Sequence, residues 1–297
     1  MDIAEGDGAL MGAIQHILMA GGIDDPVAES EQIVSEIRER DLEPMGVKER
    51  AVALAQARAS GIPLGYVLGR QRFMGVEIAV GPGVLIPRRE TELLGWEAVA
   101  RVRAARGAHG HGARLIDMCC GSGNLACGIA HAIAGVEIWA SDLMEDCADL
   151  TLHNAQRLGL SERIHVASGD LFEPLAARGA TACDVIVCNP PYISSHRLIR
   201  DRRDLLDYEP RQAFDGGPYG LSIYQRLIRD AVPFLVTGGW LLLELGVGQA
   251  VSLNLLLGRS EAYDHVELVA DSQGEPRVIA ARRAAMVKGV RSPAPGR

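Results

Sequence analysis

The sequence lacks the features of membrane-inserted, exported and strongly basic proteins. No run of apolar residues reaches the ~18 that a transmembrane helix needs, and the acidic start, Met1-Asp2-Ile3-Ala4-Glu5, lacks the positive region of a signal peptide. The formal net charge is −8, which disfavours broad, non-specific binding to nucleic-acid phosphates. We therefore expect a cytoplasmic protein with no membrane partner and no strong direct nucleic-acid binding.

Paired metal-ligating cysteines are also absent. All six cysteines lie between Cys119 and Cys188, and no two of them have the Cys-x-x-Cys spacing. This arrangement favours small buried thiols in a reducing compartment over zinc ligands or disulfides. We predict no metal site.

The chain divides into a helical part and an α/β part. Its 297 residues, 48% of them hydrophobic and 23% charged, suit one large or two unequal domains. Apolar residues recur at helical spacing before residue 60, whereas apolar strand-like segments alternate with helical ones from residue 114 onward. We predict a helical docking domain, a short β-like linker, a catalytic domain and a disordered basic tail, at residues 1–72, 73–84, 85–284 and 285–297.

The second part has the pattern of a parallel sheet. A strand at 114–119 runs into Gly121-Ser122-Gly123 and a helix, and a second strand ends at Ser141-Asp142. Further strand-like segments lie at 164–167, 185–188, 240–245, 266–269 and 278–281. Such alternation predicts a parallel sheet covered by helices on both faces, with ligands at the carboxyl ends of the strands.

A nucleoside site is predicted at the glycine-rich turn. The segment from Gly121 to Ala126 satisfies the relaxed dinucleotide fingerprint, and Asp142 lies where a carboxylate takes ribose hydroxyls. NAD, S-adenosylmethionine and a plain tight turn all remain compatible with this pattern. Asp170, after the third strand, could orient an adenine amino group or cap a helix.

The stretch Asn189-Pro190-Pro191-Tyr192 ends the fourth strand. Two consecutive prolines lock φ and donate no backbone N–H, so the stretch must be a stiff, non-helical turn. It holds a carboxamide, free carbonyls and an aromatic face in fixed relation, and these are the groups needed to grip a planar NH₂. An ordinary Asn-Pro turn is the alternative interpretation.

The order of these motifs resembles class I S-adenosylmethionine-dependent methyltransferases that act on planar nitrogen. The flanking blocks are similar to the PrmC/HemK glutamine methyltransferases, over roughly residues 60–283. These blocks are Gly61 to Gly69, Leu85 to Glu92, Tyr208-Glu209-Pro210, Gly216-Gly217, Gly239 to Glu244 and Gly274 to Arg277.

The resemblance implies an α/β fold with a class I methyltransferase Rossmann-like sheet and a small helical N-terminal domain. It implies N5-methylation of the glutamine in the Gly-Gly-Gln loop of a peptide chain release factor, the expected partner. The S-adenosyl-L-methionine site it implies comprises Cys119, Cys120, Gly121, Ser122, Gly123, Asp142, Asp170, Leu171 and Asn189. The catalytic residues it implies are Asn189, Pro190, Pro191 and Tyr192.

Four positions depart from the family pattern. Cys119 and Cys120 stand where the family usually has glycine and threonine, Arg89 replaces a proline, and Tyr219 replaces an aspartate. We expect Cys119 to fit with a negative φ. The first 45 residues match weakly, so a tailoring methyltransferase of the same fold that modifies the nitrogen or oxygen of a small metabolite is the alternative function.

Overall fold

The computed structural model describes residues 3–39, 44–105, 112–180 and 182–285. The chain divides into two compact units, one made of residues 1–71 with 79–82 and the other of residues 72–78 with 83–297. The segment predicted as a linker, 73–84, is therefore shared between the units. The predicted basic tail lies, apart from residue 285, outside the described residues. No helix of the described part has the length and apolar character needed to cross a bilayer.

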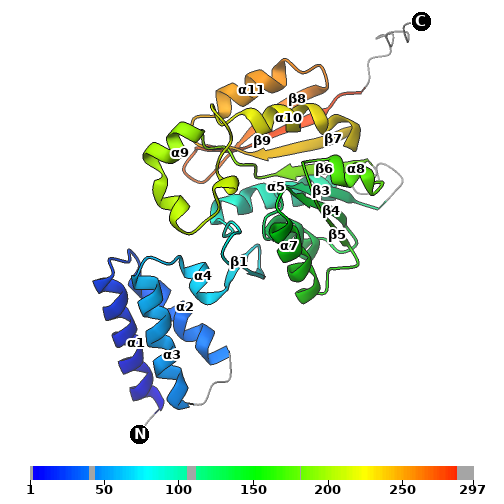
Figure 1. The fold of residues 1–297 in the computed structure, drawn as a ribbon. Coiled ribbons are helices and arrows are strands. Elements are labelled where there is room, and N and C mark those ends of the chain that lie inside the picture. Colours follow the sequence, from blue (N-terminus) through cyan, green and yellow to red (C-terminus); the bar gives the residue numbers. More distant parts are fainter. Residues whose placement is uncertain (1–2, 40–43, 106–111, 181, 286–297) are drawn as a thin grey trace, which may run out of the picture. The chain divides into compact units, whose positions relative to one another are not determined.

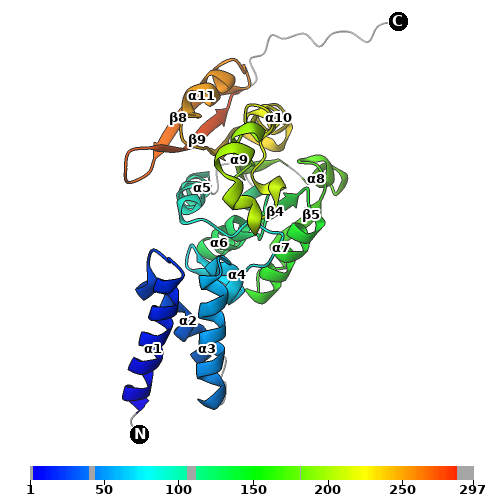
Figure 2. The ribbon, with the colours of Figure 1, turned by 60° about the vertical axis from the view of Figure 1, so that its left-hand side comes forward.

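The first unit is helical, as its apolar periodicity predicts. Its helices are α1 (Ile3–Ala20), α2 (Pro26–Glu39), α3 (Pro44–Ala59) and α4 (Leu64–Leu68). Helices α1, α2 and α3 pack side by side (Figures 1 and 2). Their shared core contains Leu10, Ile14, Leu18, Ile33, Val34, Ile37, Ala51, Ala55 and Leu68. The predicted helices at 9–18, 29–37 and 47–59 are thus confirmed.

A β-hairpin stands where the units divide. Strands β1 (Arg70–Phe73) and β2 (Val76–Ala79) form a two-stranded sheet. The two residues between them, Met74 and Gly75, both have positive φ, 47° and 82°, which is the backbone of a type I′ hairpin turn. The β-like character predicted for residues 73–80 therefore belongs to this hairpin.

The second unit is built on a seven-stranded sheet of order β5-β4-β3-β6-β7-β9-β8. The strands β3 to β7 are parallel, and β9 is antiparallel to both of its neighbours. The strands are β3 (Arg114–Met118), β4 (Glu137–Asp142), β5 (Ile164–Ser168), β6 (Cys183–Cys188), β7 (Leu235–Glu244), β8 (Tyr263–Ala270) and β9 (Pro276–Arg283). Every strand predicted from the sequence is present.

Helices pack on both faces of this sheet (Figure 1). The α-helices are α5 (Glu92–Ala105), α6 (Asn124–Ala132), α7 (Glu145–Arg157), α8 (Glu173–Ala177), α9 (Ser195–Asp201), α10 (Ser222–Asp230) and α11 (Ala250–Gly258). The 3-10 helices are η1 (Arg89–Thr91), η2 (Arg203–Asp207), η3 (Arg211–Ala213) and η4 (Val232–Phe234). Leucines of α8, α10 and α11 share one buried cluster with alternate residues of β3, β6 and β7. Because both faces are covered, all six residues of β6 are buried.

The strand order creates a crevice between β3 and β6. The chain runs outward through β3, β4 and β5, and then returns to the other side of β3 as β6. Met118 is paired with Cys188, so these two strands end at the same level. The connections after β3 and β6 leave in opposite directions, and the space between them is the usual ligand site of an open parallel sheet.

Candidate active site

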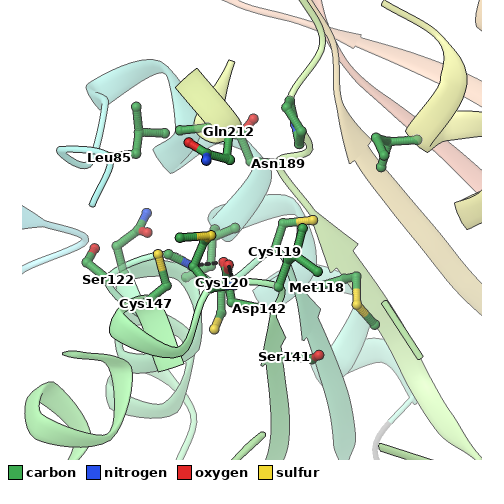
Figure 3. Close-up of a pocket in the computed structure, with 18 of the residues that line it drawn as sticks. Leu85, Met118, Cys119, Cys120, Ser122, Ser141, Asp142, Cys147, Asn189 and Gln212 are labelled. Carbon is green, nitrogen blue, oxygen red and sulfur yellow. Dashed lines mark hydrogen bonds between the residues drawn. The ribbon is translucent and has the colours of Figure 1, made fainter. Parts of the chain in front are cut away.

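A cavity opens at this crevice, and most of the predicted nucleoside site lines it. Figure 3 shows Asp142 and the loop after β3 on one side, with Asn189 and Gln212 on the other. The predicted residues that line it are Cys119, Cys120, Gly121, Ser122, Asp142, Asp170, Leu171, Asn189 and Pro191. We call this space the first cavity. Gly123 and Pro190 lie beside it but do not line it.

The loop after β3 is held in a left-handed conformation at alternate residues. Cys119, Gly121 and Gly123 have φ of 59°, 56° and 75°. A Cβ on Gly123 would lie 2.7 Å from the Thr151 side chain of α7, so this position requires glycine. The same threonine hydroxyl donates to the Gly121 carbonyl at 3.0 Å. Helix α7 thereby fixes the loop.

The expectation for Cys119 is wrong, because its φ is positive. The left-handed region costs a residue with a Cβ roughly 1–2 kcal/mol, which explains why the related family usually has glycine there. Neighbouring Cys120 is not among the left-handed residues. The substitution at 119 is therefore accommodated through backbone strain.

Asp142 ends β4 and binds the loop directly. Its Oδ2 accepts the Gly121 N–H at 2.8 Å, and its Oδ1 accepts the Met144 N–H at 3.0 Å. Burial raises the pKa of Asp142, while these N–H groups oppose the shift. The Leu143 N–H and the Cys147 thiol also hydrogen-bond to this carboxylate and oppose the shift.

Asp117, inside β3, was not predicted as a site residue. It is fully buried, and its Oδ2 accepts the Ala126 N–H at 3.0 Å, in the first turn of α6. Burial raises the pKa of Asp117 to about 8. Its Oδ1 has no partner among the described residues. An acid inside an apolar strand was the sequence signal that could have revealed it.

Asp170 lines the first cavity and is paired with a cation. Its Oδ2 accepts from Arg226 of α10 at 2.7 Å. The helix that follows, α8, receives no side-chain cap, so the capping alternative for Asp170 is wrong. Leu171, next to it, also has a positive φ of 45°. Arg226 was not predicted from the sequence, although it lines the same cavity.

The Asn-Pro-Pro-Tyr turn separates two cavities. Asn189 and Pro191 line the first, whereas Tyr192 lines a second one that also contains Arg88, Glu244 and Arg277. We call the latter space the second cavity. Among the described residues that line either cavity, Arg88 alone lines both.

The turn is held in place by segments far away in sequence. The Gln249 side chain donates to the Tyr192 carbonyl at 3.0 Å. A Cβ on Gly216 would lie 2.7 Å from the Pro191 carbonyl oxygen, so glycine at position 216 allows this close approach. Asn189 donates through Nδ2 to the Thr91 hydroxyl of η1 at 3.2 Å.

Glu209 links two of the blocks that were noted separately in the sequence. It is buried, and its Oε1 accepts the Ile86 N–H at 2.9 Å, across 123 residues of chain. Its other oxygen binds Arg88. This contact anchors the segment before η1 beside both cavities.

Comparison with known proteins defines the class first. A family model described as RNA cap guanine-N2 methyltransferase matches residues 112–201. The solved hMettl16 catalytic domain in complex with the MAT2A 3'UTR hairpin 6 is 18% identical, with a TM-score of 0.56, over 81% of this chain and 84% of that one. At this identity the likeness shows the fold. The chain has the class I, Rossmann-like methyltransferase fold.

Curated relatives define the family. A release factor glutamine methyltransferase of Geobacter sulfurreducens is 36% identical over 80% of this chain and 80% of the relative. Another, of Moorella thermoacetica, is 34% identical over 92% of this chain and 97% of the relative. The chain belongs to the release factor glutamine methyltransferase family.

Proposed function

We propose that this enzyme transfers a methyl group from S-adenosylmethionine to the side-chain nitrogen, N5, of the glutamine in the Gly-Gly-Gln loop of peptide chain release factors. The observation that carries the proposal is the position of the Asn-Pro-Pro-Tyr turn between a nucleoside-type cavity and a second cavity. Alignment with the Moorella relative covers 92% of this chain, which is enough to include part of the first 45 residues, and it favours the release factor over a small metabolite.

The residues of the first cavity fit S-adenosylmethionine. The left-handed loop brings backbone close to the cavity, which Asp142 and Asp170 also line. Asp142 would bind the ribose hydroxyls, and Asp170 would accept a hydrogen bond from the adenine amino group. The methionines and leucines that share the lining provide apolar contact for a purine. When bound, this cofactor supplies an electrophilic methyl group on a sulfonium.

On the acceptor side, the enzyme must hold a weak nucleophile in line. An amide nitrogen is a poor nucleophile because its lone pair is delocalised, so positioning dominates the rate. The Asn189 Oδ1 and the Pro190 carbonyl would accept the two amide hydrogens, which favours positive charge on nitrogen as the methyl arrives. Tyr192 would stack on the amide plane. No strong base is required, because the proton leaves after transfer.

The helical domain predicted at residues 1–72 is proposed as the docking domain for the release factor. A separate helical unit is unnecessary for shielding a small metabolite, whereas a protein partner needs a surface on the order of 800 Å² per side. Removing residues 1 to about 70 should raise the KM for the release factor much more than the KM for a short Gly-Gly-Gln peptide. Equal effects on both substrates would contradict the docking role.

The decisive experiment offers the intact enzyme a purified release factor and labelled S-adenosylmethionine. Mass spectrometry of the Gly-Gly-Gln peptide should find the mass of one added CH₂ on the glutamine. A release factor with glutamate in place of that glutamine is the control and should stay unlabelled. Labelling of a metabolite extract without any labelling of the release factor would instead support the small-molecule alternative.

A further inference from the structure

Glu244 is a buried acid that the proposed mechanism does not use. It ends β7, is 2% exposed, and lines the second cavity beside Tyr192. Its Oε2 is buried and has no hydrogen-bond partner among the described residues. Burial raises the pKa of Glu244 to about 7. An acid kept at this position has a cost to folding, which points to a role in the site.

Several elements present polar groups to this carboxyl. Hydrogen bonding to the hydroxyls of Thr91 and Tyr192 and the charge of Arg277 lower its pKa, whereas the charge of Glu90 raises it. From α10, the Tyr224 hydroxyl donates to the backbone carbonyl of Glu244 at 2.6 Å and so fixes the end of β7. Glu244 thus lies between η1 and the Asn-Pro-Pro-Tyr turn.

Thr91 joins Glu244 to Asn189. It is 2% exposed, and its hydroxyl oxygen accepts the Asn189 Nδ2–H at 3.2 Å. A hydroxyl that accepts this bond still has one hydrogen of its own to donate. Because hydrogen bonding to the Thr91 side chain is among the causes that lower the pKa of Glu244, we take the Glu244 carboxyl as the acceptor of this hydrogen.

The direction of these contacts determines how Asn189 faces the first cavity. With Nδ2 committed to Thr91, the Oδ1 atom is left to accept a hydrogen bond. If Thr91 lost its acceptor, its hydroxyl could donate to Oδ1 and stabilise the rotated carboxamide. The NH₂ of Asn189 would then face the NH₂ of the substrate amide, and two donors cannot pair.

We infer that Glu244 and Thr91 are positioning residues for methyl transfer, which together hold the Asn189 carboxamide with Oδ1 toward the acceptor amide. The inference rests on the proposed function, since it concerns the same acceptor. It assigns a task to one residue of the Leu85–Glu92 block and one of the Gly239–Glu244 block. Neither residue needs to touch the substrate.

The test compares two polar-to-apolar variants with two conservative ones. Thr91→Val removes the hydroxyl at nearly constant shape, and Glu244→Met removes the carboxyl acceptor at similar length. Thr91→Ser and Glu244→Gln each keep a hydrogen-bond acceptor at the substituted position. The kcat and the acceptor KM are measured with a Gly-Gly-Gln peptide. Calorimetry measures the affinity for S-adenosylmethionine, and thermal unfolding verifies the fold.

Thr91→Val and Glu244→Met should each lower kcat by about 10- to 100-fold, because a misdirected hydrogen bond acts in the transition state. The acceptor KM should change less than kcat, and cofactor affinity should stay within about threefold. The conservative variants should recover most of the loss. The double variant should be no slower than the slower single variant, because both act through one carboxamide.

Near-normal kcat in Thr91→Val would overturn the inference, as would losses that multiply in the double variant. If Glu244→Met did not fold, the contrast between Thr91→Val and Thr91→Ser would decide alone. These outcomes differ from failure of the proposed function, in which the wild-type enzyme would not methylate the glutamine at all.

Discussion

Replacing Cys119 by glycine should stabilise the protein relative to replacing it by alanine. Both substitutions remove the thiol, so their difference isolates the backbone of the loop after β3. Alanine keeps the Cβ at a φ of 59°, whereas glycine adopts this conformation without steric cost.

Two opposing effects set the magnitude. Releasing the left-handed strain stabilises glycine by roughly 1–2 kcal/mol, and the greater freedom of glycine in the unfolded chain offsets about 0.4–1 kcal/mol of this. The expected net gain is roughly 0–1.6 kcal/mol, with a midpoint of about 0.8 kcal/mol. For a chain of this size, the shift in Tm is about 1–4 °C upward.

Cys120 supplies the matched control, because the adjacent residue is not among those with positive φ. There the order should reverse, with Cys120→Gly less stable than Cys120→Ala by roughly 0.4–1 kcal/mol. Thermal unfolding of the four variants under reducing conditions, without cofactor, measures both differences. If alanine were the more stable substituent at 119 as well as at 120, the strain assigned to Cys119 would be refuted.

Four further outcomes are expected. Asn189→Ala should lower the rate of methyl transfer by ~10²-fold or more, while the affinity for the cofactor stays within a few fold. A near-normal rate for this variant in single-turnover assays would show the mechanism to be wrong. Tyr192→Ala should mainly raise the acceptor KM. Asp142→Ala should weaken S-adenosylmethionine binding by about 1.5–3 kcal/mol through loss of charge-assisted hydrogen bonds, and calorimetry that detects NAD binding but no S-adenosylmethionine binding would exclude the assigned cofactor. Because burial raises the pKa of Asp117 from 3.8 to about 8, the folded state binds the proton more tightly than the unfolded state, and stability from this group is lost as pH rises through that interval. Asp117→Asn should therefore gain Tm relative to wild type between about pH 5 and about pH 9; a constant difference across this range would contradict the buried protonation.

The sequence by itself determined the elements and the local motifs. Strand and helix periodicity act over a few residues, so the alternation of strands and helices after residue 114 predicted the sheet. Turn chemistry marked the ends of two strands, at Gly121-Ser122-Gly123 and at Asn189-Pro190-Pro191-Tyr192. The carboxyl-end rule for parallel strands then placed Asp142 beside the glycine loop, as the structure has it.

Only the tertiary structure decided which distant side chains meet. Ile86 binds Glu209 across 123 residues, and Asp170 binds Arg226 across 56. Such contacts depend on strand order and loop paths, and no local periodicity encodes them. The left-handed backbone of Cys119 likewise follows from Asp142 and α7 holding the loop. A short sequence window favours negative φ for cysteine, but the folded environment outweighs that preference because it fixes the loop on several sides at once.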